Sequence, residues 1–178
     1  MDFNFKYYGQ FDVSSIENKL KINTLDWDYY TFRQTYRKGQ QDTKTLPLIW
    51  SEDFTENKKW EYYSVFEDDI NEVENTLKSI LGDGRITIAI LINLPKNKKI
   101  LPHTDSGNDH FFITNRLHIP ITTNDECWFR VSDEVKQMKK GEIWEINNSD
   151  KVHSVDNDGD TDRIHLLIDY QLANKKLT

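Results

Sequence analysis

Three residues in the second half of the chain have side-chain types and spacing suited to a metal site. His103 and Asp105 are two positions apart in LPHTDSG, so an extended backbone would point both side chains to the same face. His153, in SDKVHSVDN, supplies a second imidazole from a distant segment. Two histidines and one carboxylate on one side of a metal leave the opposite positions open, which is the donor set associated with non-haem Fe(II).

The His-x-Asp pair is short and, taken alone, also fits a surface turn that follows Pro102. The order of these residues along the chain favours a metal site. His153 comes after a long stretch of strand-like sequence, and Arg163 follows ten residues later. His103, Asp105 and His153 are therefore the candidate catalytic metal ligands.

Arg163 opens the apolar segment RIHLLIDY, which is typical of a strand. Alternation places Arg163 and His165 on one face of that strand and Leu166 on the other. A guanidinium at this point suits a planar, bidentate clamp for a carboxylate. The alternative is an arginine at a strand end that reaches solvent or pairs with Asp160 or Asp162.

A second pair at the same spacing lies in NRLHIPI. Arg116 and His118 share a face there, and both can donate hydrogen bonds to the carboxylate of a small ligand. A plain surface role for Arg116, and a core or cross-strand role for His118, fit the sequence equally well.

Composition limits the remaining possibilities. Acids outnumber bases by 30 to 23, and the net charge of -7 argues against a nucleic-acid partner, since phosphate binding needs a basic footprint. Cys127 is the only cysteine, so the chain forms no internal disulfide. The first residues do not read as a secretory signal, and no apolar run suffices to cross a bilayer, so we expect a cytoplasmic protein with no membrane partner.

The first half of the chain favours helices. Ser14 and Ser15 are candidate caps for a short helix through about Leu20, and residues 25–38 are compatible with a second helix. The clearest helix is predicted over 64–81. Its apolar residues recur at steps of three and four, and Gly82 stands where a left-handed terminal residue is expected; they are Phe66, Ile70, Val73, Leu77 and Ile80.

After residue 84 the pattern changes to short strands. They are predicted at 85–94, 112–121, 127–131, 142–147 and 163–170, separated by turns at 95–99, 122–126, 139–141 and 156–160. Short strands at this spacing indicate an antiparallel sandwich or barrel. The fold class is mainly β, a jelly roll whose open mouth is a ligand site. We expect one domain over 1–178, with a mostly helical or irregular part over 1–84 and a jelly-roll core over 85–172.

Taken in order, PHTD, NRLHIPI, ECWFRVSDE, KKGEIWEINNSDKVHSV and DRIHLLIDY resemble the aspartyl/asparaginyl β-hydroxylase-like branch of the Fe(II)- and 2-oxoglutarate-dependent oxygenases. The resemblance runs from about Ile90 to Tyr170. Gly141 and Glu142 fit the turn that precedes the second iron histidine in such proteins. Some members have glycine at the carboxylate position, whereas this chain has Asp105, so a full triad is expected.

The resemblance implies a double-stranded β-helix (jelly roll, cupin-like) with N-terminal helices packed on it. It implies that Fe(II) is the metal and that 2-oxoglutarate and dioxygen (O2) are cosubstrates. Arg163 then binds the distal carboxylate of 2-oxoglutarate, and Arg116 and His118 match positions that contact the cosubstrate near the metal. Hydroxylation, with release of succinate and CO2, is the implied reaction.

Two alternatives use the same scaffold. One is a non-catalytic cupin-like module that binds a metal or small ligand, and the other is a metalloenzyme that needs no 2-oxoglutarate. The substrate is also open: a small molecule such as a free amino acid, a peptide and a protein side chain all fit. Residues 1–84 are the expected place of substrate selection.

Overall fold

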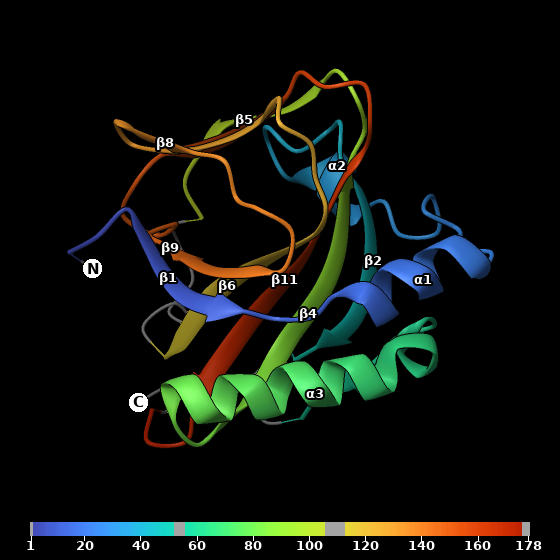
Figure 1. The fold of residues 1–178 in the computed structure, drawn as a ribbon, viewed down its shortest axis with the longest axis vertical. Coiled ribbons are helices and arrows are strands. Elements are labelled where there is room, and N and C mark those ends of the chain that lie inside the picture. The colour runs from blue at the N-terminus through green and yellow to red at the C-terminus, as the bar shows by residue number, and fades with distance from the viewer. Residues whose placement is uncertain (1, 52–55, 106–112, 176–178) are drawn as a thin grey trace.

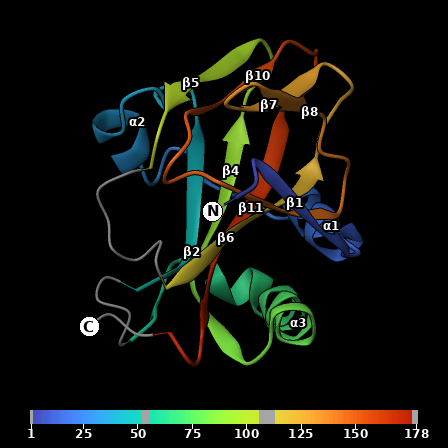
Figure 2. The same cartoon turned by 90° about the vertical axis from the view of Figure 1, so that its left-hand side faces the viewer.

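The computed structural model describes residues 2–51, 56–105 and 113–175, and the chain is mainly β (Figure 1). Within these residues seven strands form a major sheet, in the order β1-β9-β6-β11-β4-β2-β3, and four form a minor sheet, in the order β5-β10-β7-β8. All the pairings are antiparallel. The strands are β1 (Phe5–Gln10), β2 (Lys44–Trp50), β3 (Lys58–Lys59), β4 (Gly84–Leu94), β5 (Lys98–His103), β6 (Thr114–Thr122), β7 (Cys127–Val131), β8 (Glu134–Lys136), β9 (Glu142–Ile146), β10 (His153–Asn157) and β11 (Arg163–Leu172). The minor sheet lies across one end of the major sheet, which confirms the jelly roll (Figure 2).

The centre of the major sheet is the pair β4 and β11, which pair from Arg163 opposite Leu94 to Leu172 opposite Gly84, with a register shift between Asp169 and Tyr170. Both strands are rich in β-branched and leucine side chains, and both of their faces are covered. Leu166 and Ile168 belong to the main apolar cluster shared with the helices. Arg163 and His165 lie on the other face, as alternation predicted, and both line a pocket.

The long helix α3 (Tyr63–Leu81) covers the outer face of the major sheet (Figure 1). It confirms the helix predicted over 64–81. Phe66, Ile70 and Leu77 are among its buried residues. Gly82 follows with a φ of 98°, a conformation that glycine adopts without steric cost. The periodicity placed Ile80 on the apolar face of this helix, and this was wrong, because Ile80 is 36% exposed at the last turn.

The helix α1 (Ser14–Ile22) confirms the predicted short helix, but the serines do not cap it with their side chains. Instead the Ser14 backbone N–H donates to the Asp12 carboxylate at 2.9 Å. Ile16 is the buried residue of this helix and joins the main core. An acid two residues earlier therefore takes the place of the predicted cap.

The helix predicted over 25–38 is wrong in extent, because only α2 (Phe32–Tyr36) is helical. The preceding residues follow an irregular path fixed by aromatic contacts. The Tyr29 ring meets the Tyr62 ring edge-on at 5.8 Å, and the Tyr30 ring meets the Trp60 ring at 5.3 Å. These long-range contacts override a local helical pattern.

The expectation of a mostly helical or irregular N-terminal half was incomplete, because β1 and β2 both join the major sheet. β2 is buried and pairs with β4. Pro47 lies inside β2, where it argues against a strand, and the register shifts between Pro47 and Ile49. The irregularity explains how the sheet tolerates a residue without a backbone donor.

Two predicted turns were placed too broadly. β5 begins at Lys98, inside the predicted 95–99 turn, and the turn itself is marked by Asn97 with a φ of 58°. β10 likewise takes the first two residues of the predicted 156–160 turn. β5 is an edge strand, and its Lys98 and Lys99 lie at about half exposure in ion pairs, so its sequence lacks apolar alternation.

The other predicted strands lie on β4, β6, β7, β9 and β11. The first position of the strand predicted at 112–121 falls outside the described residues. No helix in the described part of the chain is long and apolar enough to cross a membrane.

Candidate metal centre and cosubstrate pocket

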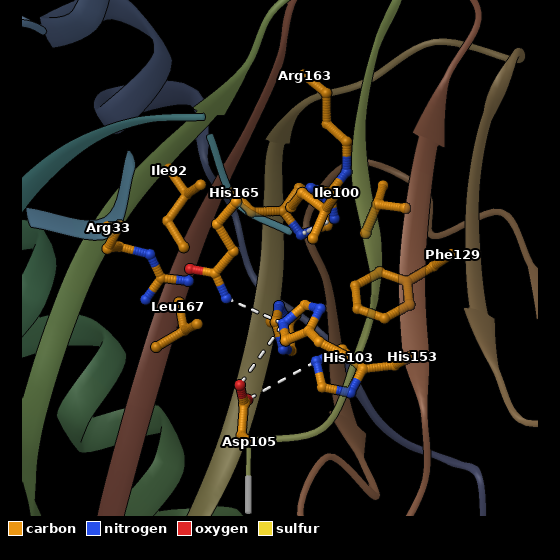
Figure 3. Close-up of a pocket in the computed structure, with 13 residues that line it drawn as sticks. Arg33, Ile92, Ile100, His103, Asp105, Phe129, His153, Arg163, His165 and Leu167 are labelled. Carbon is orange, nitrogen blue, oxygen red and sulfur yellow. Dashed lines mark hydrogen bonds and ion pairs between the residues drawn. The ribbon is translucent and has the colours of Figure 1, made fainter. Parts of the chain in front are cut away.

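The three predicted metal ligands come together at one end of the pocket between the two sheets (Figure 3). One ligand atom from each of His103, Asp105 and His153 lies within 4.8 Å of the others. His103 ends β5 and His153 begins β10, and the two residues are direct partners in the minor sheet. Asp105 follows just after β5. The Nε2 atoms of His103 and His153 lie 3.6 Å and 3.7 Å from the Asp105 carboxylate oxygens.

Backbone contacts set both imidazoles to present Nε2. The Nδ1–H of His103 donates to the Leu101 carbonyl at 2.8 Å, and His153 Nδ1 lies 3.4 Å from the Lys151 carbonyl. Burial lowers the pKa of His153 to about 4, even though Asp105 opposes the shift. Neutral imidazoles with a free Nε2 lone pair are the form that binds a divalent metal.

Asp105 is held ionised and fixed in place. Its burial favours the neutral acid, but Arg116, His153 and Asn148 outweigh that effect and hold the pKa of the Asp105 carboxyl well below its usual range. Arg116 Nη1 and Asn148 Nδ2 each donate to Asp105 Oδ2 at 2.9 Å. The Asp105 backbone N–H donates to the Asn148 carbonyl, also at 2.9 Å.

Arg116 contacts Asp105, a candidate metal ligand, and is not among the residues that line the pocket. Its Nε and Nη2 donate to the two Asp169 oxygens at 2.7 and 2.6 Å. This bidentate pair is buried, and Arg116 and Asp169 are register partners on β6 and β11. A contact of Arg116 with the cosubstrate stays a prediction; in the structure Arg116 donates to the Asp105 and Asp169 carboxylates.

Arg163 is 3% exposed and lines the pocket at the end away from Asp105 (Figure 3). Its Nη2 donates to His165 Nδ1 at 2.6 Å, and its guanidinium lies 5.6 Å from the centre of the Phe129 ring. No described carboxylate forms an ion pair with it. Asp162, the suggested partner, accepts from Asn93 and from the Lys96 backbone instead. Burial lowers the pKa of Arg163 to about 10, so the group stays charged at neutral pH.

His118 and His165 lie deep in the same pocket, with ring centres 6.1 Å apart. Burial, followed by the charge of Arg163, lowers the pKa of both imidazoles well below the usual value. The Nε2 atoms of both are buried and have no hydrogen-bond partner. Buried polar atoms without partners at a charged pocket indicate a place built for a polar ligand.

The pocket also contains residues that the sequence did not single out. They are the polar Arg33 and Gln40 and the apolar Ile92, Ile100, Phe129, Val155 and Leu167. Asp169 carried a usable signal, because alternation places it on the face of β11 that bears Arg163. Arg33 and Gln40 carried none, since they come from irregular segments outside any motif.

Gln40 contacts the metal centre directly. Its Nε2 donates to His103 Nε2 at 2.9 Å, on the lone pair that a metal would use. Its Oε1 is buried without a partner. A metal at the triad therefore requires the Gln40 amide to turn from His103.

A model of the family described as Aspartyl/Asparaginyl beta-hydroxylase matches residues 10–172. The chain belongs to this family. The match includes both the N-terminal helices and the jelly roll, so residues outside the metal motif belong to the family pattern as well.

Solved structures show the same fold at low sequence identity. An oxidoreductase of the 2OG-Fe(II) oxygenase family from Burkholderia pseudomallei is 12% identical, with a TM-score of 0.63 over 89% of this chain and 77% of that chain. The viral collagen prolyl hydroxylase of Paramecium Bursaria Chlorella virus-1, solved as a 2OG complex, is 11% identical, with a TM-score of 0.53 over 97% and 98%. A Trichoplax adhaerens prolyl hydroxylase, in complex with a hypoxia inducible factor peptide fragment, is 11% identical, with a TM-score of 0.51 over 94% and 83%.

Proposed function

We propose that this protein is an Fe(II)- and 2-oxoglutarate-dependent oxygenase that hydroxylates an amino acid or a peptide or protein side chain. One observation carries the proposal. A His-Asp-His cluster, with its ligand atoms within 4.8 Å of one another, shares a pocket with Arg163, a buried arginine that has no described counter-ion. A metal-chelating dicarboxylate satisfies both features, because one end binds the metal and the other end neutralises the arginine.

The residues fit these groups chemically. His103, Asp105 and His153 supply two neutral nitrogens and one anionic oxygen, a set suited to Fe(II). Arg163 supplies the cation for the distal carboxylate of 2-oxoglutarate, and His118 lines the same pocket with an unpartnered Nε2. With O2, the bound iron and 2-oxoglutarate would supply an oxidant for an unactivated C–H bond, with succinate and CO2 as the coproducts.

The chain's own residues position and protect this chemistry. Arg116 keeps Asp105 ionised and oriented through a 2.9 Å hydrogen bond, and Asp169 holds Arg116 in turn. Ile92, Ile100 and Leu167 make part of the pocket wall apolar, which excludes water from the reacting centre. The family match and the names of the similar structures support the same reaction class.

Two other functions remain as competitors on the same scaffold. A metalloenzyme that does not use 2-oxoglutarate would need the triad but not Arg163. A non-catalytic cupin-like binding module would hold metal and ligand without turnover. The buried charge of Arg163 favours the 2-oxoglutarate enzyme, because a buried cation costs stability unless a ligand anion compensates it.

The test is an anaerobic titration of the metal-free protein with Fe(II) and then with 2-oxoglutarate, followed by visible absorption. We expect a metal-to-ligand charge-transfer band that His153→Ala abolishes. Arg163→Met should weaken 2-oxoglutarate binding by about tenfold to a hundredfold, the loss of a charge-assisted bidentate contact. Arg130→Met is the matched control, because Arg130 lies on β7, is exposed and pairs with Asp156.

Each failure points to one competitor. Iron binding without the band would contradict the use of 2-oxoglutarate and favour a different metalloenzyme. A band without O2-dependent consumption of 2-oxoglutarate, across a screen of amino acids and peptides, would favour the binding module. Absence of iron binding would contradict the triad itself.

A further inference from the structure

Arg33 places a second cation in the pocket, on a side chain that is half-buried. It comes from α2, in the N-terminal half, and its guanidinium enters the pocket from a different side than Arg163 (Figure 3). Its Nε is buried and has no hydrogen-bond partner. No described carboxylate lies within ion-pair distance of the Arg33 side chain. Burial lowers the pKa of Arg33 to about 10, which leaves the group protonated at neutral pH.

Nothing in the local structure accounts for this placement as packing. Arg37, one turn later in the chain, is exposed and lies 5.7 Å from the Phe32 ring. Arg33 remains partly exposed, but its Nε is buried and its side chain lines the pocket together with Asp105 and His103. A guanidinium in a pocket whose Nε is buried without a hydrogen-bond partner, and which has no described counter-ion, indicates a ligand that supplies the missing anion.

A count of the charges around the pocket indicates that 2-oxoglutarate does not supply the anion that Arg33 lacks. Arg116 is paired with Asp169 and also reaches Asp105. The two charges of Fe(II) are balanced by Asp105 and the metal-bound carboxylate of 2-oxoglutarate, and its other carboxylate balances Arg163. Among the described residues, Arg33 is the one pocket cation left without an anion.

We infer that Arg33 is the anchor for a carboxylate group of the substrate, so the enzyme selects an amino-acid-like molecule that carries a negative charge near the metal. This inference rests on the proposed function. Gln40 supports the amino-acid assignment, because its amide lines the same pocket, would be released from His103 by a bound metal, and has an Oε1 without a partner. A carboxylate for Arg33 and an N–H for Gln40 are the two polar groups of an amino-acid unit.

Two sources of the carboxylate share this chemistry: the α-carboxylate of a free amino acid and the side-chain carboxylate of an acidic residue. Three compounds with one carbon skeleton separate them. Free L-asparagine has only the α-carboxylate, N-acetyl-L-aspartic acid α-amide has only the side-chain carboxylate, and N-acetyl-L-asparagine amide has neither. Each is titrated calorimetrically into the protein loaded with Zn(II) and 2-oxoglutarate, which does not turn over.

We expect one carboxylate compound to bind at least about tenfold tighter than the neutral amide, and its identity names the source. Arg33→Met should remove that preference, whereas Arg37→Met, the matched control on the same segment, should retain it. Arg33→Met should leave 2-oxoglutarate binding within about twofold, whereas Arg163→Met should weaken it about tenfold or more. The melting temperature of Arg33→Met should equal or exceed that of the unmodified protein, because a half-buried charge without a described counter-ion is removed.

Four outcomes overturn the inference. They are equal binding of all three compounds, a carboxylate preference that survives Arg33→Met, a loss of 2-oxoglutarate binding in Arg33→Met as large as in Arg163→Met, and a clear fall in its melting temperature. If 2-oxoglutarate does not bind the zinc protein at all, the proposed function fails. The same three titrations on the zinc-only protein then decide the Arg33 site separately.

Discussion

The two faces of the major sheet are built by the same strands and bury different chemistry. On β11, Leu166 and Ile168 point toward α3 and are fully buried among apolar side chains. Arg163, His165 and Asp169 alternate with them and point between the two sheets, where they are just as buried. The outer face is dominated by apolar packing, whereas the inner face contains several buried charges that need partners.

The difference is visible in the buried atoms that lack hydrogen bonds. Arg33 Nε, Gln40 Oε1 and the Nε2 atoms of His118 and His165 all belong to residues that line the inner pocket. Six other such atoms in the described residues lie outside this pocket, but these four share one cavity. Unsatisfied buried groups are rare in native proteins, so the four indicate that stability was given up there for binding. Substitutions on the outer face should therefore lower mainly the stability, whereas substitutions on the inner face should also change metal or ligand binding.

The largest effect is expected from Asp169→Asn on the inner face. The change leaves Arg116 buried with only Asp105 as its acidic partner in the described structure, and it removes one end of a bidentate pair. We expect a loss of about 3–5 kcal/mol in the free energy of unfolding. Metal affinity should also fall about tenfold to a hundredfold, because Arg116 then orients Asp105 less firmly.

Urea unfolding of the metal-free variant and a Zn(II) competition titration measure the two effects. Asp162→Asn is the control, since Asp162 accepts from Asn93 and Lys96 and has no contact with the triad. Unchanged metal affinity in Asp169→Asn would show that Asp105 is positioned without Arg116.

Neighbouring leucines on β11 separate the faces directly. Leu166 is fully buried against the helices, and Leu167 is 3% exposed and lines the pocket. Leu166→Ala should cost about 3 kcal/mol of unfolding free energy and leave the affinity of the folded protein for 2-oxoglutarate unchanged. Leu167→Ala should cost less stability, because its cavity opens into the pocket, and should weaken 2-oxoglutarate or substrate binding. Equal profiles for the two variants would contradict the division between the faces.

The outer face was the more predictable part of the fold. The spacing of Phe66, Ile70, Val73 and Leu77 predicted α3, and the β-branched run of β4 predicted a buried strand. Elements that depend on distant contacts were missed. β2 contains Pro47, and β5 is rich in lysine at a sheet edge, so neither has the local pattern of a strand.

In the candidate site, too, residues with a local sequence pattern were predicted, and roles that depend on distant contacts were missed. His103, Asp105 and His153 were predicted from order and spacing, and the structure brings them together through the β5–β10 pairing. The partners of Arg116 could not be read from the sequence alone, because they depend on the register of β6 against β11. Arg33 was beyond prediction, since its role depends on where a single helical turn packs.

The free energy of unfolding is expected to change by about 2 kcal/mol with pH because of a histidine on the inner face. The pKa of His153 is lowered to about 4 by burial, from an ordinary 6.5. Between those values the unfolded chain binds a proton that the native protein does not, so stability rises with pH and is lost as pH falls. From pH 7 to pH 5 the metal-free protein should lose about 2 kcal/mol through His153, and His118 and His165 add in the same direction.

Unfolding by urea at pH 7 and pH 5 measures this loss. His153→Gln should reduce the difference between the two pH values by about 2 kcal/mol. A variant with the full difference would show that His153 is not the titrating group. Saturating Zn(II) should raise the stability at both pH values without reducing the difference, because the bound metal keeps native His153 unprotonated while the unfolded chain still gains its proton.

The smallest effect is expected at the edge of the outer face. Periodicity placed Ile80 with the core residues of α3, but it is 36% exposed, whereas Leu77 is fully buried. Ile80→Ala should therefore change the free energy of unfolding by about 0.5 kcal/mol, against about 3 kcal/mol for Leu77→Ala. Urea unfolding of both variants compares them, and neither change should alter metal binding by the folded protein. A cost at Ile80 close to that at Leu77 would mean that the last turn of α3 packs against the sheet as firmly as its middle, and the apolar face would then extend to the end of the helix.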